Sequence, residues 1–165
     1  MEKDELLVAI RKGIMAERDS IELYQKALNS AEDEEVRSFF QERVEEEKQH
    51  YNYLVNYSHD IEHDKELVDY TQDLPDPEPA KIFSDSFLRR IGEKQTLFSA
   101  ISTAVLLEKD SLQHYKNLAQ DAEQPELKSF FGRMGHWETQ HYIDVLNIQK
   151  EAERFYWELN DFEPF

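Results

Sequence analysis

The chain contains no cysteine, and this absence excludes several classes of site. Disulfide frameworks, thiolate-held metal centres and thiol catalysis all need a residue that none of the 165 positions supplies. Glycine and proline are also scarce, with four and five residues. Because β-branched runs are few while Glu, Lys, Leu and Ala are abundant, the composition favours an all-helical protein.

Basic charge and long apolar runs are scarce as well. The formal net charge of −17 disfavours nucleic acid as a partner, since nucleic-acid binding needs a basic face. No run reaches the roughly 18 apolar residues of a membrane span, and the acidic start Met1-Glu2-Lys3-Asp4 is not typical of a signal peptide. We therefore expect a cytoplasmic protein without a membrane partner, built as one domain over residues 1–165.

One pattern occurs twice in the chain. Residues 2–56 align without a gap on residues 93–147, an offset of 91, and 20 of the 55 aligned positions are identical. Each copy carries a lone Glu and, thirty residues later, a Glu-x-x-His. The repeat predicts an internal pseudo-two-fold axis that relates two sets of metal-binding side chains. The two sets are Glu17, Glu47 and His50 in the first copy and Glu108, Glu138 and His141 in the second.

Apolar residues that recur every three or four positions predict four long helices. Their expected ranges are about 3–28, 33–58, 93–120 and 125–157, and a loose period would extend the second helix to Tyr70. Short turns make each pair an antiparallel hairpin, and residues 58–92 form a long crossover between the second and third helices. Within it, Pro75, Pro77 and Pro79 exclude a helix, whereas an amphipathic piece should end near Gly92. The expected fold is an all-α, antiparallel four-helix bundle.

The Glu-x-x-His spacing suits metal binding. Positions three apart on a helix differ by about 60° in azimuth, so each pair can offer a carboxylate oxygen and an imidazole nitrogen to one cation. Taken alone, such a pair is more typical of a solvated helix face. However, Glu17 lies within an apolar stripe, and Glu108 follows an apolar run, where an unpaired charge is costly. Two divalent cations would neutralise four carboxylates, and these ligands suit iron or manganese.

This set of six residues resembles the ferritin-like superfamily, in particular the di-iron domains of rubrerythrins and bacterioferritins. The resemblance implies two iron ions as cofactor, with manganese as an alternative. It implies that Glu47 and Glu138 bridge the metals. Glu17 with His50, and Glu108 with His141, would complete the separate ligand sets. The implied activity is a non-haem di-iron peroxidase or ferroxidase that reduces hydrogen peroxide or dioxygen.

The chain departs from typical rubrerythrins in two ways. It lacks the four cysteines of their rubredoxin-like iron centre, so electrons would come from an external donor protein or from Fe(II) itself. Ser111 stands where rubrerythrins tend to carry an extra Glu, which leaves a symmetric, bacterioferritin-like ligand set. Three alternatives stay open: ferritin-type iron storage, a dimanganese catalase-like activity, and a helical interaction module without turnover. We expect a homodimer or a higher homo-oligomer.

Two tyrosines keep the same place in both copies. Tyr24 and Tyr115 each follow the lone Glu by seven residues, two turns along the same helix face. We expect each hydroxyl to hydrogen-bond a ligand carboxylate or to act as a one-electron donor. The alternative is a core tyrosine whose hydroxyl has found some other partner. An aromatic tail should cover the bundle or a dimer seam: Phe155, Tyr156, Trp157, Phe162 and Phe165.

Overall fold

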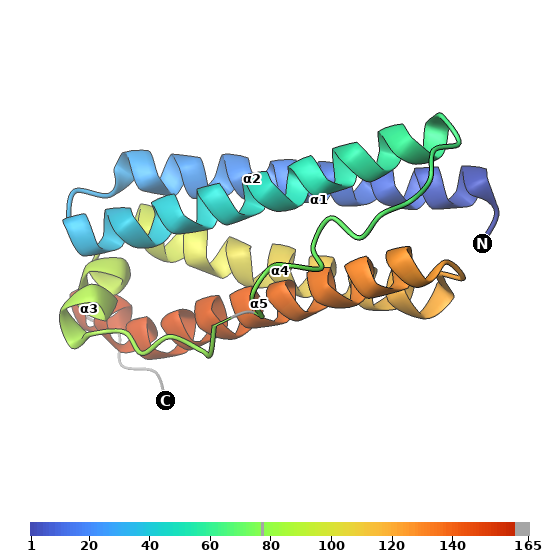
Figure 1. Ribbon diagram of the computed structural model, residues 1–165. Coiled ribbons are helices and arrows are strands. Elements are labelled where there is room, and N and C mark those ends of the chain that lie inside the picture. Colours follow the sequence, from blue (N-terminus) through green and yellow to red (C-terminus); the bar gives the residue numbers. More distant parts are fainter. Residues whose placement is uncertain (77, 161–165) are drawn as a thin grey trace.

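The computed structural model describes residues 1–76 and 78–160, and all regular structure in this part of the chain is helical. Four long helices form a bundle, and a short fifth helix closes one of its ends (Figure 1). The prediction of an all-α four-helix bundle is confirmed. The helices are α1 (Lys3–Ser30), α2 (Glu34–Glu62), α3 (Asp85–Glu93), α4 (Gln95–Asp121) and α5 (Pro125–Leu159).

Local capping signals explain where α2, α3 and α5 start. The carboxylate of Asp33 accepts hydrogen bonds from the backbone N–H groups of Glu35 and Val36 at the start of α2. The hydroxyl of Ser84 does the same for a first-turn N–H of α3, at 3.0 Å. Pro125 occupies the first turn of α5, where its missing N–H has no intrahelical partner to lose. Each start is therefore encoded by a residue that satisfies or removes an unpaired donor.

The helices form two antiparallel hairpins, α1–α2 and α4–α5, and α1 packs against α4. The crossover leaves the end of α2 and returns along the length of the bundle to α3 (Figure 1). Helix α2 ends at Glu62, so its extension to Tyr70 is not formed. Instead, Asp64 has a left-handed φ of 51°. The chain then folds back, so that the Tyr57 hydroxyl donates to the Val68 carbonyl at 2.7 Å.

The crossover is tied to the helices on both sides of residue 77. Arg133 of α5 donates to the Leu74 carbonyl at 2.9 Å, and the Lys81 N–H donates to Asp144 of α5 at 3.0 Å. The Lys81 ammonium also pairs with Glu42 of α2 at 2.6 Å. These contacts attach the crossover to α2 and α5. The expected helix break at Pro77 lies outside the described residues, whereas α3 forms where the amphipathic piece was expected.

The apolar core is divided into two clusters, one toward each end of the bundle. One contains Tyr24, Phe39, Phe40 and Ile101 and extends to α3, and the other contains Ile10, Leu54, Tyr115 and Phe130. In α1 the three- and four-residue spacing predicts an inward stripe of Ile10, Ile14, Ile21, Tyr24 and Leu28, but Ile14, Ile21 and Leu28 are only partly buried. Small residues lie inside instead, since the neighbouring helix leaves little room. A Cβ on Gly13 would lie 3.1 Å from the Tyr115 hydroxyl. The buried small residues are Gly13, Ser20 and Ala27.

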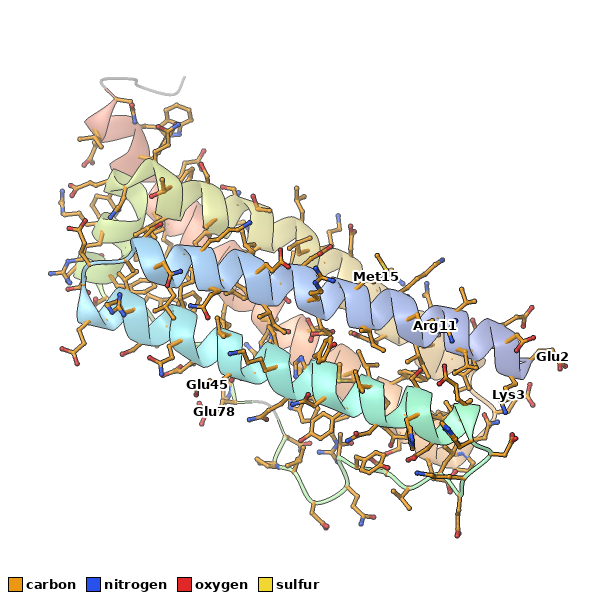
Figure 2. The ribbon with its side chains drawn as sticks, turned by 90° about the horizontal axis from the view of Figure 1, so that it is seen from above. Glu2, Lys3, Arg11, Met15, Glu45 and Glu78 are labelled. Carbon is orange, nitrogen blue, oxygen red and sulfur yellow. The ribbon has the colours of Figure 1, made fainter. Side chains whose placement is uncertain are left out.

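The outer faces carry mainly charged and polar side chains, with a few exposed apolar residues such as Met15 on α1 (Figure 2). None of the helices in the described part of the chain is long and apolar enough to cross a membrane. Of the aromatic tail, Phe155 is buried in the cluster near α3, and Tyr156 stacks on Phe98 with ring centroids 4.6 Å apart. Phe162 and Phe165 lie outside the described residues.

Candidate metal centre

A layer of buried polar residues separates the two apolar clusters. Each long helix contributes to it: α1 and α4 one glutamate each, and α2 and α5 one Glu-x-x-His pair each. All six side chains identified from the repeat lie in this layer, and none is more than 5% exposed. They are Glu17, Glu47, His50, Glu108, Glu138 and His141. The bundle therefore brings together the residues that the two sequence copies keep 91 positions apart.

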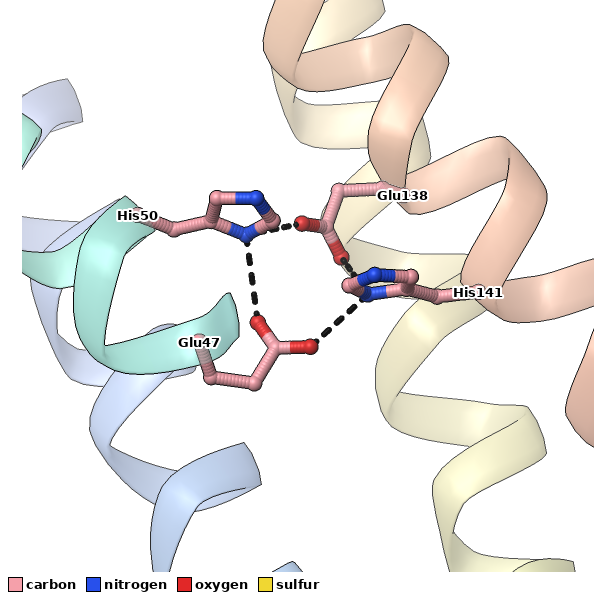
Figure 3. A group of neighbouring side chains, drawn as sticks. All are labelled: Glu47, His50, Glu138 and His141. Carbon is pink, nitrogen blue, oxygen red and sulfur yellow. Dashed lines mark hydrogen bonds and ion pairs between the residues drawn. The ribbon is translucent and has the colours of Figure 1, made fainter. Parts of the chain in front are cut away.

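The two Glu-x-x-His pairs face each other across the layer (Figure 3). The Nδ1 atom of His50 lies 2.8 Å from Oε1 of Glu138 and 3.2 Å from Oε2 of Glu47. The Nδ1 atom of His141 lies 2.8 Å from Oε1 of Glu47 and 4.0 Å from Oε2 of Glu138. One possible ligand atom from each of the four residues lies within 4.8 Å of all the others. Glu47 and Glu138 thus approach both histidines.

The two lone glutamates flank this group on opposite helices. Oε2 of Glu17 lies 3.5 Å from Nδ1 of His50, and Oε2 of Glu108 lies 3.8 Å from Nδ1 of His141. The structure therefore places one lone glutamate beside each histidine. This arrangement divides the six side chains into two outer Glu–His pairs and two central glutamates.

The two tyrosines that occupy equivalent positions in the repeat contact the lone glutamates of the opposite copy. The Tyr24 hydroxyl on α1 donates to Glu108 on α4, and the Tyr115 hydroxyl on α4 donates to Glu17 on α1. Both tyrosines are at most 1% exposed, and burial raises the pKa of both phenols well above the usual value. The hydroxyls therefore stay protonated. Tyr24 belongs to one apolar cluster and holds the carboxylate of Glu108, and Tyr115 belongs to the other cluster and holds the carboxylate of Glu17.

Burial acts to raise the pKa of all four glutamates, but the contacts of Glu47 with His141 and His50 lower its pKa well below the usual value. For the other three glutamates burial dominates. It raises the pKa of Glu17 to about 8, although a hydrogen bond to His50 opposes the shift. Burial, together with the neighbouring carboxylates, raises the pKa of Glu138 well above its usual value. Burial alone would lower the pKa of His50, but its close contacts with the carboxylates of Glu138, Glu17 and Glu47 raise it well above its usual value. Without metal the layer therefore retains protons, which a bound cation has to displace.

The layer contains buried polar atoms that have no hydrogen-bond partner among residues 1–76 and 78–160. Although Nδ1 of His141 and Oε1 of Glu47 are 2.8 Å apart, they are not aligned for a hydrogen bond. Oε2 of Glu108 and Oε1 of Glu138 also have no hydrogen-bond partner. Such atoms are costly in a protein interior unless something binds them. Four carboxylates and two imidazoles fit two divalent cations in charge and in ligand type, so these residues suit a two-metal centre.

Three further charged residues adjoin the layer, and the sequence prediction missed them. Arg43 is 3% exposed, with Nη1 3.2 Å from Oε2 of Glu46 and Nη2 3.4 Å from Oδ2 of Asp144. Oε2 of Glu46 lies 3.3 Å from Nε2 of His141. The repeat could not reveal these residues, because their counterparts are Met134, Trp137 and Tyr53. Arg43 could have been identified from the sequence, because a charged residue on the inward stripe of α2 indicates a buried partner.

A cavity of about 250 Å³ lies between this layer and the crossover. His50 and His141 of the layer line the cavity, together with Trp137 and Gln140 of α5 and crossover residues such as Leu74. The amide nitrogen of Gln140 is buried and has no hydrogen-bond partner in the described part of the chain. The cavity therefore offers a small polar molecule space beside the histidines.

A four-helix bundle with a long crossover and an inward Glu, Glu-x-x-His set from each half defines the ferritin-like class. A model of the rubrerythrin family matches residues 12–149, which include all six residues of the layer. The chain belongs to the rubrerythrin family, and its buried carboxylate–histidine cluster is consistent with a di-iron site. No curated protein and no solved structure gives a significant match to it.

Proposed function

We propose that this protein is a di-iron oxidoreductase that reduces hydrogen peroxide or dioxygen with electrons from an external donor. One observation carries the proposal: six buried Glu and His side chains, matched across the repeat, form a layer with unpartnered ligand atoms. Membership of the rubrerythrin family supports the same chemistry. Because the 165 residues contain no cysteine, they hold no thiolate-bound iron centre that could store electrons for this site.

The six residues have distinct roles in this proposal. Glu47 and Glu138 lie close to both histidines and would be shared between the two ions. Glu17 with His50, and Glu108 with His141, would each hold one ion. When bound, the two irons would supply the two electrons that convert one peroxide and two protons into two waters.

The surrounding residues orient the ligands and control access. The hydroxyls of Tyr24 and Tyr115 keep Glu108 and Glu17 in place, as outer hydrogen bonds do for metal ligands in general. The apolar clusters exclude water from both ends of the layer. The cavity under the crossover leaves the histidine side accessible to a small polar oxidant.

Stopped-flow oxidation of the iron-loaded protein tests the proposal. Protein loaded anaerobically with two equivalents of Fe(II) is mixed with hydrogen peroxide, and formation of Fe(III) is followed by absorption. We expect oxidation faster than that of free Fe(II), with two irons oxidised per peroxide. The double variant Glu47→Gln/Glu138→Gln should lose the acceleration, whereas Glu45→Gln, a change on the exposed side of α2, should keep it (Figure 2). A wild-type rate equal to that of free Fe(II) would refute the proposal.

A further inference from the structure

The two histidines of the layer have different outer surroundings, although the repeat relates them. The residue before each Glu of the Glu-x-x-His pairs reaches across to the histidine of the other helix. Trp137 on α5 stacks on His50, with ring centroids 5.3 Å apart and planes 16° apart. Its counterpart on α2 is Glu46, whose Oε2 lies 3.3 Å from Nε2 of His141. On its outer side, His50 therefore contacts an aromatic ring, whereas His141 contacts a further carboxylate.

The two histidines also differ in the charged residues nearby, because Arg43 and Asp144 lie close to the Glu46 that contacts His141. The guanidinium of Arg43 lies between Glu46 and Asp144, which are 3.2 and 3.4 Å from its two terminal nitrogens. The backbone N–H of Lys81 in the crossover donates to the other carboxylate oxygen of Asp144 at 3.0 Å. Two carboxylates and one guanidinium leave one excess negative charge here. At the corresponding places near His50, the repeat has Met134 in place of Arg43 and Tyr53 in place of Asp144.

The contact between Glu46 and His141 has a direct consequence for a metal ligand. Nδ1 of His141 faces the other carboxylates of the layer, so its outer Nε2 is the atom that can donate to Glu46. Nε2 and Oε2 are 3.3 Å apart but are not aligned for a hydrogen bond among the described residues, so a bound metal would have to orient the imidazole for this donation. A carboxylate that accepts the outer N–H of a ligating imidazole fixes its tautomer and strengthens it as a ligand, and its loss typically costs about 10- to 100-fold in metal affinity. Stacking on Trp137 orients the His50 ring but adds no such charge.

We propose that the two metal positions are unequal and that Glu46 is a positioning residue that makes the His141 position the tighter one. Arg43, which also pairs with Asp144, places its positive charge 3.2 Å from the Glu46 carboxylate and so favours its position beside the imidazole. The inference rests on the two-metal centre of the proposed function, but it concerns binding and not turnover. It therefore predicts two distinct binding constants in a site whose six ligands are related by the repeat.

Titration of the metal-free protein with Co(II) tests the inference without any redox reaction. Calorimetry and visible absorption should show two binding steps, with dissociation constants that differ by about tenfold or more. His141→Ala should remove the tighter step, and His50→Ala the weaker one. Glu46→Gln should weaken the tighter step by about tenfold and leave the weaker step unchanged, and Glu46→Ala should do so more strongly.

Two matched controls separate positioning from general damage. Glu45→Gln makes the same chemical change on the exposed side of α2, and Trp137→Phe keeps an aromatic ring at the repeat-related position. Both should leave the tighter step within about twofold of the wild type, since neither touches the Glu46–His141 contact. In the Co(II) protein, the shifted NMR signal of one histidine N–H should move in Glu46→Gln, and the other should not.

Several outcomes would overturn the inference. Two equal sites in the wild type would do so while leaving the proposed function intact. An equal loss in both steps for Glu46→Gln would indicate a merely structural role. A wild-type protein that binds no Co(II) would overturn both this inference and the two-metal centre on which the proposed function depends.

Discussion

Replacing Glu138 with glutamine should separate the stability of the metal-free fold from that of the metal-bound protein. Glu138 is 1% exposed, and burial together with the nearby carboxylates raises its pKa well above the usual value. The raised pKa therefore favours the protonated, neutral form of this side chain in the metal-free protein. Glutamine has nearly the same shape and is also neutral. We expect the free energy of unfolding of the metal-free variant to stay within about 1 kcal/mol of the wild type.

The metal-bound state should respond much more strongly. A ligand present at 100 times its dissociation constant stabilises a fold by about 2.7 kcal/mol, so two ions would add about 5 kcal/mol. For a chain of 165 residues this corresponds to a rise in Tm of roughly 10–20 °C. Glu138 approaches both histidines, so its loss should weaken both positions by about tenfold or more. At the same metal concentration about 1.4 kcal/mol per ion would remain, which halves the rise in Tm.

Thermal unfolding with and without Mn(II) measures both quantities in one experiment. A chelator provides the metal-free reference, and Glu45→Gln provides a matched change on the exposed side of the same bundle (Figure 2). The control should keep the full metal-dependent rise. If Glu138→Gln keeps it as well, or if the wild type shows none, the assignment of Glu138 as a shared ligand is wrong.

Three further changes test other parts of the structure. Tyr24→Phe and Tyr115→Phe should each lower the free energy of unfolding of the metal-free protein by about 1–3 kcal/mol in denaturant titrations, because each leaves a buried carboxyl without its donor; losses below about 0.5 kcal/mol would contradict this. In thermal unfolding, Gly92→Ala should destabilise by about 1–3 kcal/mol, since its Cβ would lie 2.4 Å from a backbone oxygen of α5, whereas Gly132→Ala, with nothing within 4 Å, should stabilise by about 0.5–1 kcal/mol; the opposite order would refute the packing described for α3. Because the raised pKa of Glu17, about 8, keeps its carboxyl protonated at neutral pH, Mn(II) binding should release protons and its affinity should rise between about pH 6 and 8; calorimetry in buffers of different ionisation enthalpy measures this, and a pH-independent affinity would contradict it.

Apolar periodicity predicted most of the fold. The starts of α2 and α5 follow Asp33 and Pro125, whose effects are local and therefore visible in the sequence. The end of α2 was not predictable in the same way. It depends on the Tyr57 hydroxyl, which bonds to backbone eleven residues further along after the chain has folded back. The inward face of α1 was misread for a related reason, because large aliphatic residues give a strong signal and small buried ones such as Ser20 give almost none.

The candidate site was predictable as far as the repeat extends. A residue such as Glu17 has an identical counterpart in the second copy of the repeat, and its place in an apolar stripe is a second, independent signal. Glu46 and Asp144 occur in one copy only, and their contacts join helices that are distant in sequence. Arg43 was detectable in principle, since it shares the inward face of α2 with His50. The unrepeated residues are therefore the ones for which a three-dimensional structure was needed.

Each tyrosine donates its hydrogen bond to a glutamate of the other hairpin, so neither hairpin alone contains a complete set of contacts for its part of the metal centre. Residues 1–62 supply Glu17 but not the hydroxyl that holds it, and Glu108 depends in the same way on a tyrosine from the first hairpin. Completing the centre and docking the hairpins are therefore a single cooperative event. Metal binding in the layer therefore requires docked hairpins, and a hairpin expressed alone would expose its inward glutamate to water.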